Sequence, residues 1–161
     1  NGFFPNFSIA QNMAVSQSLK RGGYKGAMGL FREGDERRTA EEQRKLLALK
    51  CHSVDQNITE LSGGNQQKVL ISKWLCCSPE VIIFDEPTRG IDVGAKAEIY
   101  KVMRQLADDG KVILMVSSEL PEIIAVCDRI AVFCEGRLTQ ILTNRDDMSE
   151  EEIMAWALPQ E

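Results

Sequence analysis

The sequence predicts an α/β fold built on a parallel sheet, and three features of the chain support this class. Val81–Phe84 and Val112–Val116 are short, continuous apolar runs, as expected of strands that are buried on both faces of a sheet. Between them, residues 94–108 carry an apolar stripe at helical spacing that includes Ile99 and Leu106. Strand and helix patterns continue to alternate toward the end of the chain, which is typical of parallel sheets flanked by helices.

The first third of the chain has a helical pattern instead. Ser8 and Gln11 have the spacing of a capping box, which predicts a helix that starts there. Thr39 and Glu42 repeat this spacing and predict the start of a second helix. The stretch from Lys20 to Gly34 is rich in glycine and basic residues, so we expect a loop between the two helices.

The remaining elements form an α/β part over residues 61–161, which follows a helical subdomain over residues 1–60. A helix should begin at Ser62 and end before Pro79, because proline cannot continue a helix. The elements expected after the second strand are a short helix from Pro121, a strand at Ile130–Cys134, a tight turn at Glu135-Gly136, a paired strand at Leu138–Leu142 and a helix capped by Ser149 and Glu152.

Composition narrows the class of protein. The 161 residues correspond to about one domain. The formal net charge of −5 argues against a nucleic-acid binder, which would usually carry a basic face. No apolar run approaches the length of a membrane span and no signal-peptide pattern opens the chain, so we expect any membrane association to come through a partner. The five cysteines, an odd number, are typical of reduced thiols in a cytosolic protein.

Two local features bear on a metal site and on the start of the chain. Cys51-His52 raises the question of a metal site, but no second His/Cys pair has ligand spacing, so an ordinary thiol beside an ordinary histidine is favoured. The chain opens on Asn1-Gly2 and continues directly into the apolar Phe3-Phe4, whereas a free terminus is more often polar. We interpret this as a chain that begins inside a domain.

The first chemical motif is the segment Leu61–Lys68, which reads Leu-Ser-Gly-Gly-Asn-Gln-Gln-Lys. Ser62 is a favourable N-cap, and Gly63 and Gly64 follow it in the first helical turn, where glycine costs stability. Backbone N–H groups at a helix N-terminus bind anions, so a phosphate could lie against these three residues. The alternative is an ordinary junction between a loop and a helix.

The second and third motifs are acidic. Asp85 and Glu86 follow the apolar run at 81–84, at the strand end where open α/β sheets bind ligands. Asp85 can hold Mg²⁺ through water, and Glu86 can orient an attacking water or accept its proton. The alternative is a solvated acidic turn. Asp92 lies a few residues further on and could cap the next helix, a structural role that can coexist with a functional one.

Together, the three motifs resemble the signature, the Walker B strand with its catalytic glutamate, and the D-loop of ABC ATPases. The resemblance covers nearly the whole chain, since Phe4–Met13 looks like the segment that follows the family's Q-loop. Leu61–Lys68 and Asp85–Lys96 are similar to the C-terminal cassette of two-cassette monosaccharide importers.

The resemblance implies an ABC ATPase-type fold with ATP and Mg²⁺ as cofactors. In this family, ATP lies between the P-loop of one cassette and the signature of the opposite one. The implied roles are contact with the opposite cassette's ATP for Ser62, Gly63, Gly64 and Gln66, metal binding for Asp85, catalysis for Glu86 and contact across the cassette pair for Asp92.

The resemblance also implies partners and a location. The partners would be a second cassette, the permease subunits of an importer and, indirectly, a periplasmic sugar-binding protein. The chain would act at the cytoplasmic face of the plasma membrane, and its helical front, about Ser8 to Glu60, would lie toward the permease.

One departure from the family is a missing motif. No Gly-x-x-x-x-Gly-Lys-Ser/Thr occurs in the sequence, and the nearest stretch, Gly22–Gly29, lacks the Gly-Lys-Ser/Thr ending and the flanking strand and helix. We therefore expect an incomplete cassette that lacks the P-loop part. Such a chain should have no ATPase activity alone, bind ATP weakly and expose apolar sheet surface.

The other departure is Ser118, which stands where the family expects a histidine after the strand Val112–Val116 and which we count, by this position, among the expected cofactor-binding residues. Serine cannot take up and pass on a proton near neutral pH as histidine can. Hydrolysis at the site that contains Glu86 should therefore be weak, whereas the signature looks intact.

Three functions are compatible with parts of this pattern. The leading hypothesis is the C-terminal part of the ATP-binding subunit of a sugar importer. A non-catalytic module that docks on a permease or on a partner cassette also fits a retained signature without a P-loop. A DNA-repair or ribosome-associated ABC ATPase is disfavoured by the acidic charge and by the absence of a coiled-coil flank.

Overall fold

The computed structural model describes residues 2–20 and 33–159. These residues gather into two compact units, Asn1–Ile82 with Thr88–Val112, and Ile83–Pro87 with Ile113–Glu161. The division passes through two neighbouring strands and does not coincide with the expected boundary near residue 60. The division into residues 1–60 and 61–161 stays a prediction.

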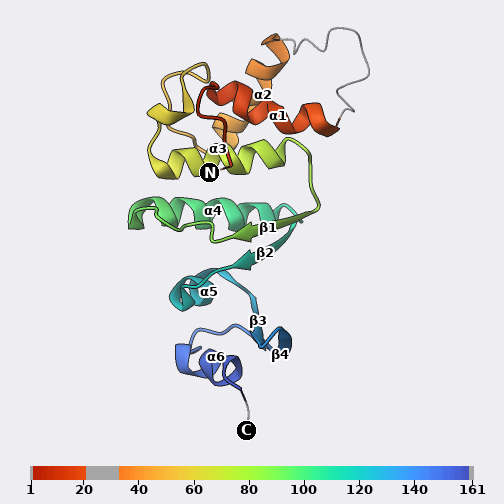
Figure 1. Cartoon of the computed structure of the whole chain (residues 1–161), viewed down its shortest axis with the longest axis vertical. Coiled ribbons are helices and arrows are strands. Elements are labelled where there is room, and N and C mark those ends of the chain that lie inside the picture. The colour runs from red at the N-terminus through yellow and green to blue at the C-terminus, as the bar shows by residue number, and fades with distance from the viewer. Residues whose placement is uncertain (1, 21–32, 160–161) are drawn as a thin grey trace. The chain divides into compact units, whose positions relative to one another are not determined.

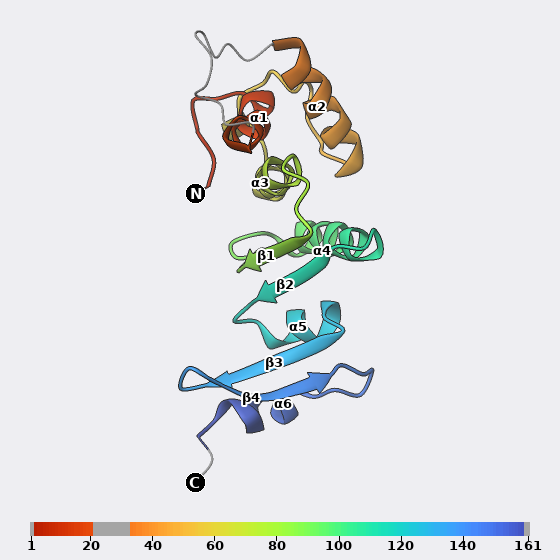
Figure 2. The same ribbon diagram turned by 90° about the vertical axis from the view of Figure 1, so that its right-hand side faces the viewer.

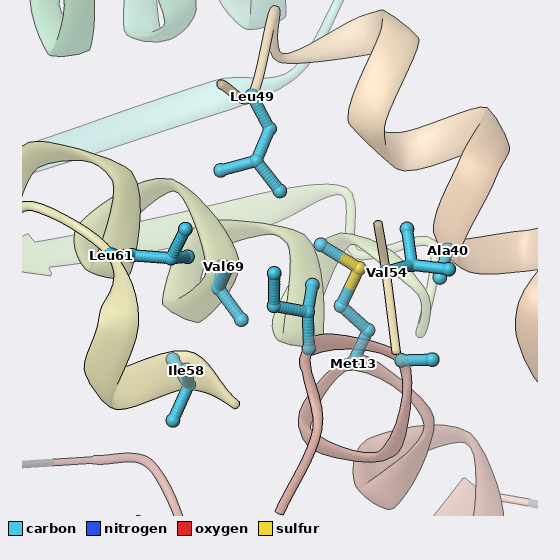
Figure 3. Packing of buried hydrophobic residues seen from close by; sticks show 9 residues of the cluster. Met13, Ala40, Leu49, Val54, Ile58, Leu61 and Val69 are labelled. Atoms are coloured by element: carbon cyan, nitrogen blue, oxygen red, sulfur yellow. The ribbon is translucent and has the colours of Figure 1, made fainter. Parts of the chain in front are cut away.

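The first unit is helical (Figures 1 and 2). Its elements are α1 (Ile9–Lys20), α2 (Glu33–Leu46), the 3₁₀ turn η1 (Ile58–Glu60), α3 (Gly63–Leu75) and α4 (Val93–Asp108). Helix α1 packs against α2 and α3, and α3 packs against α4. Met13 of α1, Ala40 of α2, Ile58 of η1 and Val69 of α3 are buried together in one core (Figure 3).

Two helix starts in this unit test the capping predictions. The capping box is confirmed at α1, where the Ser8 N–H donates to Gln11 Oε1 at 2.9 Å and the Gln11 N–H donates to Ser8 Oγ at 3.1 Å. The second prediction is wrong, because α2 begins at Glu33 and Thr39 lies inside it. The loop expected from Lys20 to Gly34 lies for the most part outside the described residues.

The second unit contains most of the strands. Strands β1 (Val81–Asp85) and β2 (Val112–Val116) pair, and α5 (Leu120–Val126) follows them. Strands β3 (Arg129–Cys134) and β4 (Arg137–Thr143) form an antiparallel hairpin with a register shift at Val132/Phe133, and α6 (Glu150–Ala157) packs on it. Ile130, Val132, Met148 and Ile153 form its buried core. The hairpin and the Ser149 cap of α6 confirm the sequence predictions.

Strands β1 and β2 run parallel. The Val112 N–H donates to Glu80 O, and the Glu86 N–H donates to Val116 O, both at 2.9 Å, so the strands begin together and end together. Burial on both faces was expected and is wrong, since Ile83 is 68% exposed, Leu114 52% and Val116 55%. Each of these three residues in the described part of the chain therefore presents half or more of its surface to solvent. The exposed apolar surface expected of the sheet is therefore present.

Among residues 2–20 and 33–159, no helix combines the length and the apolar character that crossing a bilayer requires.

Candidate nucleotide half-sites

The first candidate site lies at the start of α3. Ser62 is the N-cap in extended conformation, as predicted, but its side chain makes no capping hydrogen bond to the helix. Gly64 is buried, and a Cβ atom placed there would lie 2.6 Å from the Cβ of Ala95 in α4. Gly63 is exposed, and a Cβ there would meet no atom within 4 Å. Gly64 thus allows two helices to approach, and Gly63 leaves open space at the helix N-terminus.

Asp92 lies at the start of α4, the helix that Gly64 contacts through Ala95. Its Oδ1 accepts the Ala95 N–H at 3.0 Å, so Asp92 caps α4 as the structural alternative predicted. The structure therefore brings the start of α3 and the start of α4 together through the Gly64–Ala95 contact. The carboxylate of Asp92 remains exposed at this edge.

Gln66 faces the preceding loop. Its Nε2 donates to the Leu61 carbonyl oxygen at 3.0 Å, and its backbone N–H donates to Ser62 O at 2.9 Å. In this arrangement the side chain closes the turn that leads into α3. Its contact with a nucleotide stays a prediction.

Asn65 is a residue at this site that the sequence pattern did not single out. Its Nδ2 donates to Ser62 Oγ at 2.9 Å, and its Oδ1 accepts the backbone N–H of Lys50 at 3.0 Å. The available signal was its position three residues after an N-cap serine, which is the spacing at which side chains reach back to the cap. Asn65 therefore joins the signature serine to the loop that contains Lys50.

A charged network connects the same region to its neighbours. Lys68 in α3 is buried, with its side chain 3% exposed, and its Nζ donates to Ala48 O at 3.1 Å and to Glu98 Oε2 at 2.9 Å. Lys50 Nζ reaches the other oxygen of Glu98 at 3.1 Å. The hydrogen bond from Lys68, followed by the one from Lys50, lowers the pKa of the Glu98 carboxyl. This network joins α3, α4 and the loop at 48–50.

The second candidate site lies at the end of β1. Asp85 is the last residue of the strand and is exposed, so its carboxylate is accessible at the carboxyl end of the sheet. Glu86 has a φ of +47°, a left-handed conformation that costs a residue with a side chain about 1–2 kcal/mol. Its N–H still bonds to Val116 O, so the turn is held by the neighbouring strand. Strain of this kind is common where a side chain must be aimed at a ligand.

Ser118 meets Glu86 through its backbone. The Ser118 N–H donates to Glu86 Oε1 at 2.9 Å. The neighbouring Ser117 Oγ accepts the Glu119 N–H at 3.1 Å and donates to Oε2 of the buried Glu122 at 3.0 Å, which holds the loop in place. The backbone N–H of Ser118 therefore orients the Glu86 carboxylate. Any residue except proline would supply the same N–H at this position. The role of Glu122 was not predicted either, because no local pattern marks it.

The metal-binding potential of the described residues is limited. They include no group of three or more His, Cys, Asp or Glu side chains that could hold a metal ion. Asp85 could supply one oxygen ligand, which suits Mg²⁺ because this ion retains several waters and takes further oxygens from phosphates.

Comparison with known proteins identifies the family. The ABC transporter profile matches residues 1–89, which is more than half of the chain. This chain belongs to the ABC transporter family. The ABC expectation drawn from the signature and Walker B motifs is thereby confirmed.

Two curated relatives are named for sugar import. The chain is 93% identical over 161 residues to the D-allose import ATP-binding protein of Escherichia coli (strain K12), covering 100% of this chain and 32% of that protein. It is 47% identical over 157 residues to a ribose import ATP-binding protein of Agrobacterium fabrum, covering 98% of this chain and 30% of that protein. The chain thus spans about a third of the length of the relatives that it matches.

Solved structures confirm the ABC-type α/β fold. A dimeric ATP-binding cassette in a post-hydrolysis state, bound to ADP and Pi, superposes with a TM-score of 0.70 at 26% identity, over 89% of this chain and 59% of that one. A second ATP-binding cassette of an ABC transporter superposes with a TM-score of 0.76 over 98% of this chain and 67% of that one. Its 20% identity supports the fold alone.

Proposed function

We propose that this chain is the C-terminal part of the ATP-binding subunit of an ABC importer for D-allose or a similar monosaccharide. The observation that carries this proposal is the 93% identity with the D-allose import ATP-binding protein across the full length of the chain. In this role, ATP binding and hydrolysis would drive uptake through permease subunits, with a periplasmic sugar-binding protein delivering the sugar.

The start of α3 would bind the phosphates of ATP held by an opposite cassette. Support comes from the exposed Ser62 side chain, the open space beside Gly63 and the backbone N–H groups of a helix N-terminus, which together suit an anion. Gln66 would contribute from the same turn, and Asp92 would contact the opposite cassette from the adjacent start of α4.

Asp85 and Glu86 would serve the ATP of their own cassette. Asp85 fits Mg²⁺ because it offers an exposed carboxylate at the carboxyl end of a parallel strand. Glu86 would orient an attacking water, with its carboxylate held by the Ser118 N–H. Because Ser118 supplies no imidazole, hydrolysis at this second site is expected to be slow, and the site completed by the signature would carry most turnover.

The test uses a chimaeric protein in which this chain replaces the matching part of the D-allose relative. This joined protein is expressed in cells that lack the relative itself. Uptake of labelled D-allose and Mg²⁺-dependent ATP hydrolysis by the purified transporter are measured. We expect uptake to be restored and the isolated 161-residue chain to hydrolyse no ATP. Restored ATP hydrolysis without sugar uptake would refute the importer assignment, and hydrolysis by the isolated chain would refute its dependence on a P-loop supplied elsewhere.

Two variants of the joined protein separate the roles of the two sites. Ser62→Ala removes a donor from the faster site and should lower ATP hydrolysis by about tenfold or more, since donors to developing charge carry large effects. Glu86→Gln removes the carboxylate from the slower site and should lower hydrolysis by about twofold or less, since that site contributes little turnover. The steady-state rate of phosphate release measures both effects. A larger loss of ATP hydrolysis from Glu86→Gln than from Ser62→Ala would show that the site with Ser118 is the faster one.

A second candidate is a non-catalytic cassette that docks on a permease or on a partner cassette. The observation that favours it is Ser118, which meets Glu86 through its backbone N–H and supplies no imidazole there. Co-purification of the isolated chain with permease subunits, without restored uptake in the joined protein, would favour this candidate.

A further inference from the structure

Asn65 controls which way the hydroxyl of Ser62 can donate. The Lys50 backbone N–H donates to Asn65 Oδ1 at 3.0 Å, and only the carbonyl oxygen of the Asn65 amide can accept this hydrogen bond. The NH₂ end of the amide must then face Ser62, and it donates to Ser62 Oγ at 2.9 Å. Ser62 Oγ is therefore an acceptor in this contact, and the hydroxyl retains its own proton for another partner.

The surroundings of Ser62 show where that proton can go. Ser62 is exposed, and its side chain does not cap α3. Beside it, Gly63 faces space that contains no atom within 4 Å of a Cβ position. A phosphate oxygen at this helix N-terminus would accept both the backbone N–H groups and the outward hydroxyl.

The loop that supplies the Lys50 N–H is anchored, so the direction of the amide is built into the fold. Lys50 Nζ bonds to Glu98, Glu98 bonds to the buried Lys68, and Lys68 bonds to the carbonyl of Ala48. The Lys50–Glu98 ion pair therefore holds the loop at 48–50 to α4, and the hydrogen bond from Lys68 to Ala48 O holds it to α3. Asn65 lies in the first turn of α3, at the end of this series of contacts.

We propose that Asn65 is a positioning residue that turns the Ser62 hydroxyl outward as a donor to a nucleotide phosphate. The inference rests on the proposed function, because it requires a phosphate to bind at the start of α3. It adds a residue that acts through Ser62, and it assigns the direction of the hydrogen bond.

The test is a double-mutant cycle in the joined full-length protein, with kcat/KM for ATP as the readout. Asn65→Leu keeps the approximate size and removes both hydrogen bonds, and should lower kcat/KM by about threefold to tenfold, the range of one neutral hydrogen bond. In the Ser62→Ala background, the same substitution should change kcat/KM by less than about twofold, because the group through which Asn65 acts is gone.

A second substitution tests the direction of the hydrogen bond. Asn65→Asp still accepts the Lys50 N–H, but both of its oxygens are acceptors, so the Ser62 hydroxyl would turn inward to donate. We expect Asn65→Asp to lower kcat/KM by about tenfold or more. Gln67→Glu adds the same charge two residues further along α3 and is the matched control, with an expected loss of less than about threefold.

The outcomes separate the inference from the proposed function. If Asn65→Leu lowers kcat/KM equally with Ser62 present and with Ser62 replaced by alanine, Asn65 has a structural role only and the inference is overturned. Equal losses of kcat/KM from Asn65→Asp and Gln67→Glu would also overturn it. If the joined protein with Asn65 intact neither hydrolyses ATP nor imports sugar, the proposed function fails, and the inference fails with it.

Discussion

At the scale of single residues, Gly63 and Gly64 are neighbours with opposite surroundings. Gly64 lies where a Cβ would be 2.6 Å from Ala95 Cβ, and Gly63 faces open space. Gly64→Ala should lower the free energy of unfolding by about 1–2 kcal/mol, because the overlap outweighs the better helix propensity of alanine. Gly63→Ala is the matched control and should leave stability unchanged or raise it by up to about 1 kcal/mol. Urea unfolding followed by circular dichroism measures both.

A rescue experiment tests the cause of that difference. Ala95→Gly removes the methyl group that Gly64→Ala would strike, so the double variant should lose less stability than the sum of the two single losses. Additive losses would show that the contact between α3 and α4 does not require glycine at this position.

At the scale of helices and loops, the Glu98 carboxylate joins α3 and α4 through its two lysines. The hydrogen bond from Lys68 lowers the pKa of Glu98 below its ordinary value of 4.5. The folded state therefore binds this proton less readily than the unfolded state, so the stabilisation is present above about pH 4.5 and is lost as pH falls through the folded pKa. The loss should be modest, because the side chain is 40% exposed.

The measurement compares urea midpoints of the chain and of Glu98→Gln from about pH 6 down to the acid range. The unaltered chain should lose more stability than the variant on acidification, since the amide of Glu98→Gln does not titrate. Other carboxyls such as Asp55 titrate in both proteins, so the difference isolates Glu98. Identical pH profiles would show that the network contributes nothing to folding.

At the scale of the whole molecule, the exposed face of β1 and β2 governs behaviour in solution. Ile83, Leu114 and Val116 lie on neighbouring strands, and each is more than half exposed. Apolar strand surface of this kind promotes association. We expect the isolated chain to self-associate in sedimentation velocity at micromolar concentration, and Leu114→Lys to shift it toward the monomer. Gln105→Lys adds the same charge at an exposed position of α4 and should have no effect. A monomeric unaltered chain would contradict this prediction.

Local sequence patterns were sufficient to predict much of the fold and part of the candidate site. The capping box at Ser8, the start of α3 after Ser62, the Asp92 cap of α4 and the β3–β4 hairpin were all predictable, because each depends on residues a few positions apart. The signature and Walker B motifs likewise identify the family, because each is a continuous segment of the chain.

Tertiary structure decided features that depend on distant segments. The close approach at Gly64 requires Ala95, the direction of the Ser62 hydroxyl requires the Lys50 N–H, and the aim of Glu86 requires its positive φ and Ser118. The capping spacing at Thr39 predicted the wrong start for α2, which begins at Glu33. By itself, the sequence determined which elements form and which chemistry they carry, because periodicity and capping act over one or two turns. Only the folded chain decided which side chains meet, because those contacts join segments tens of residues apart.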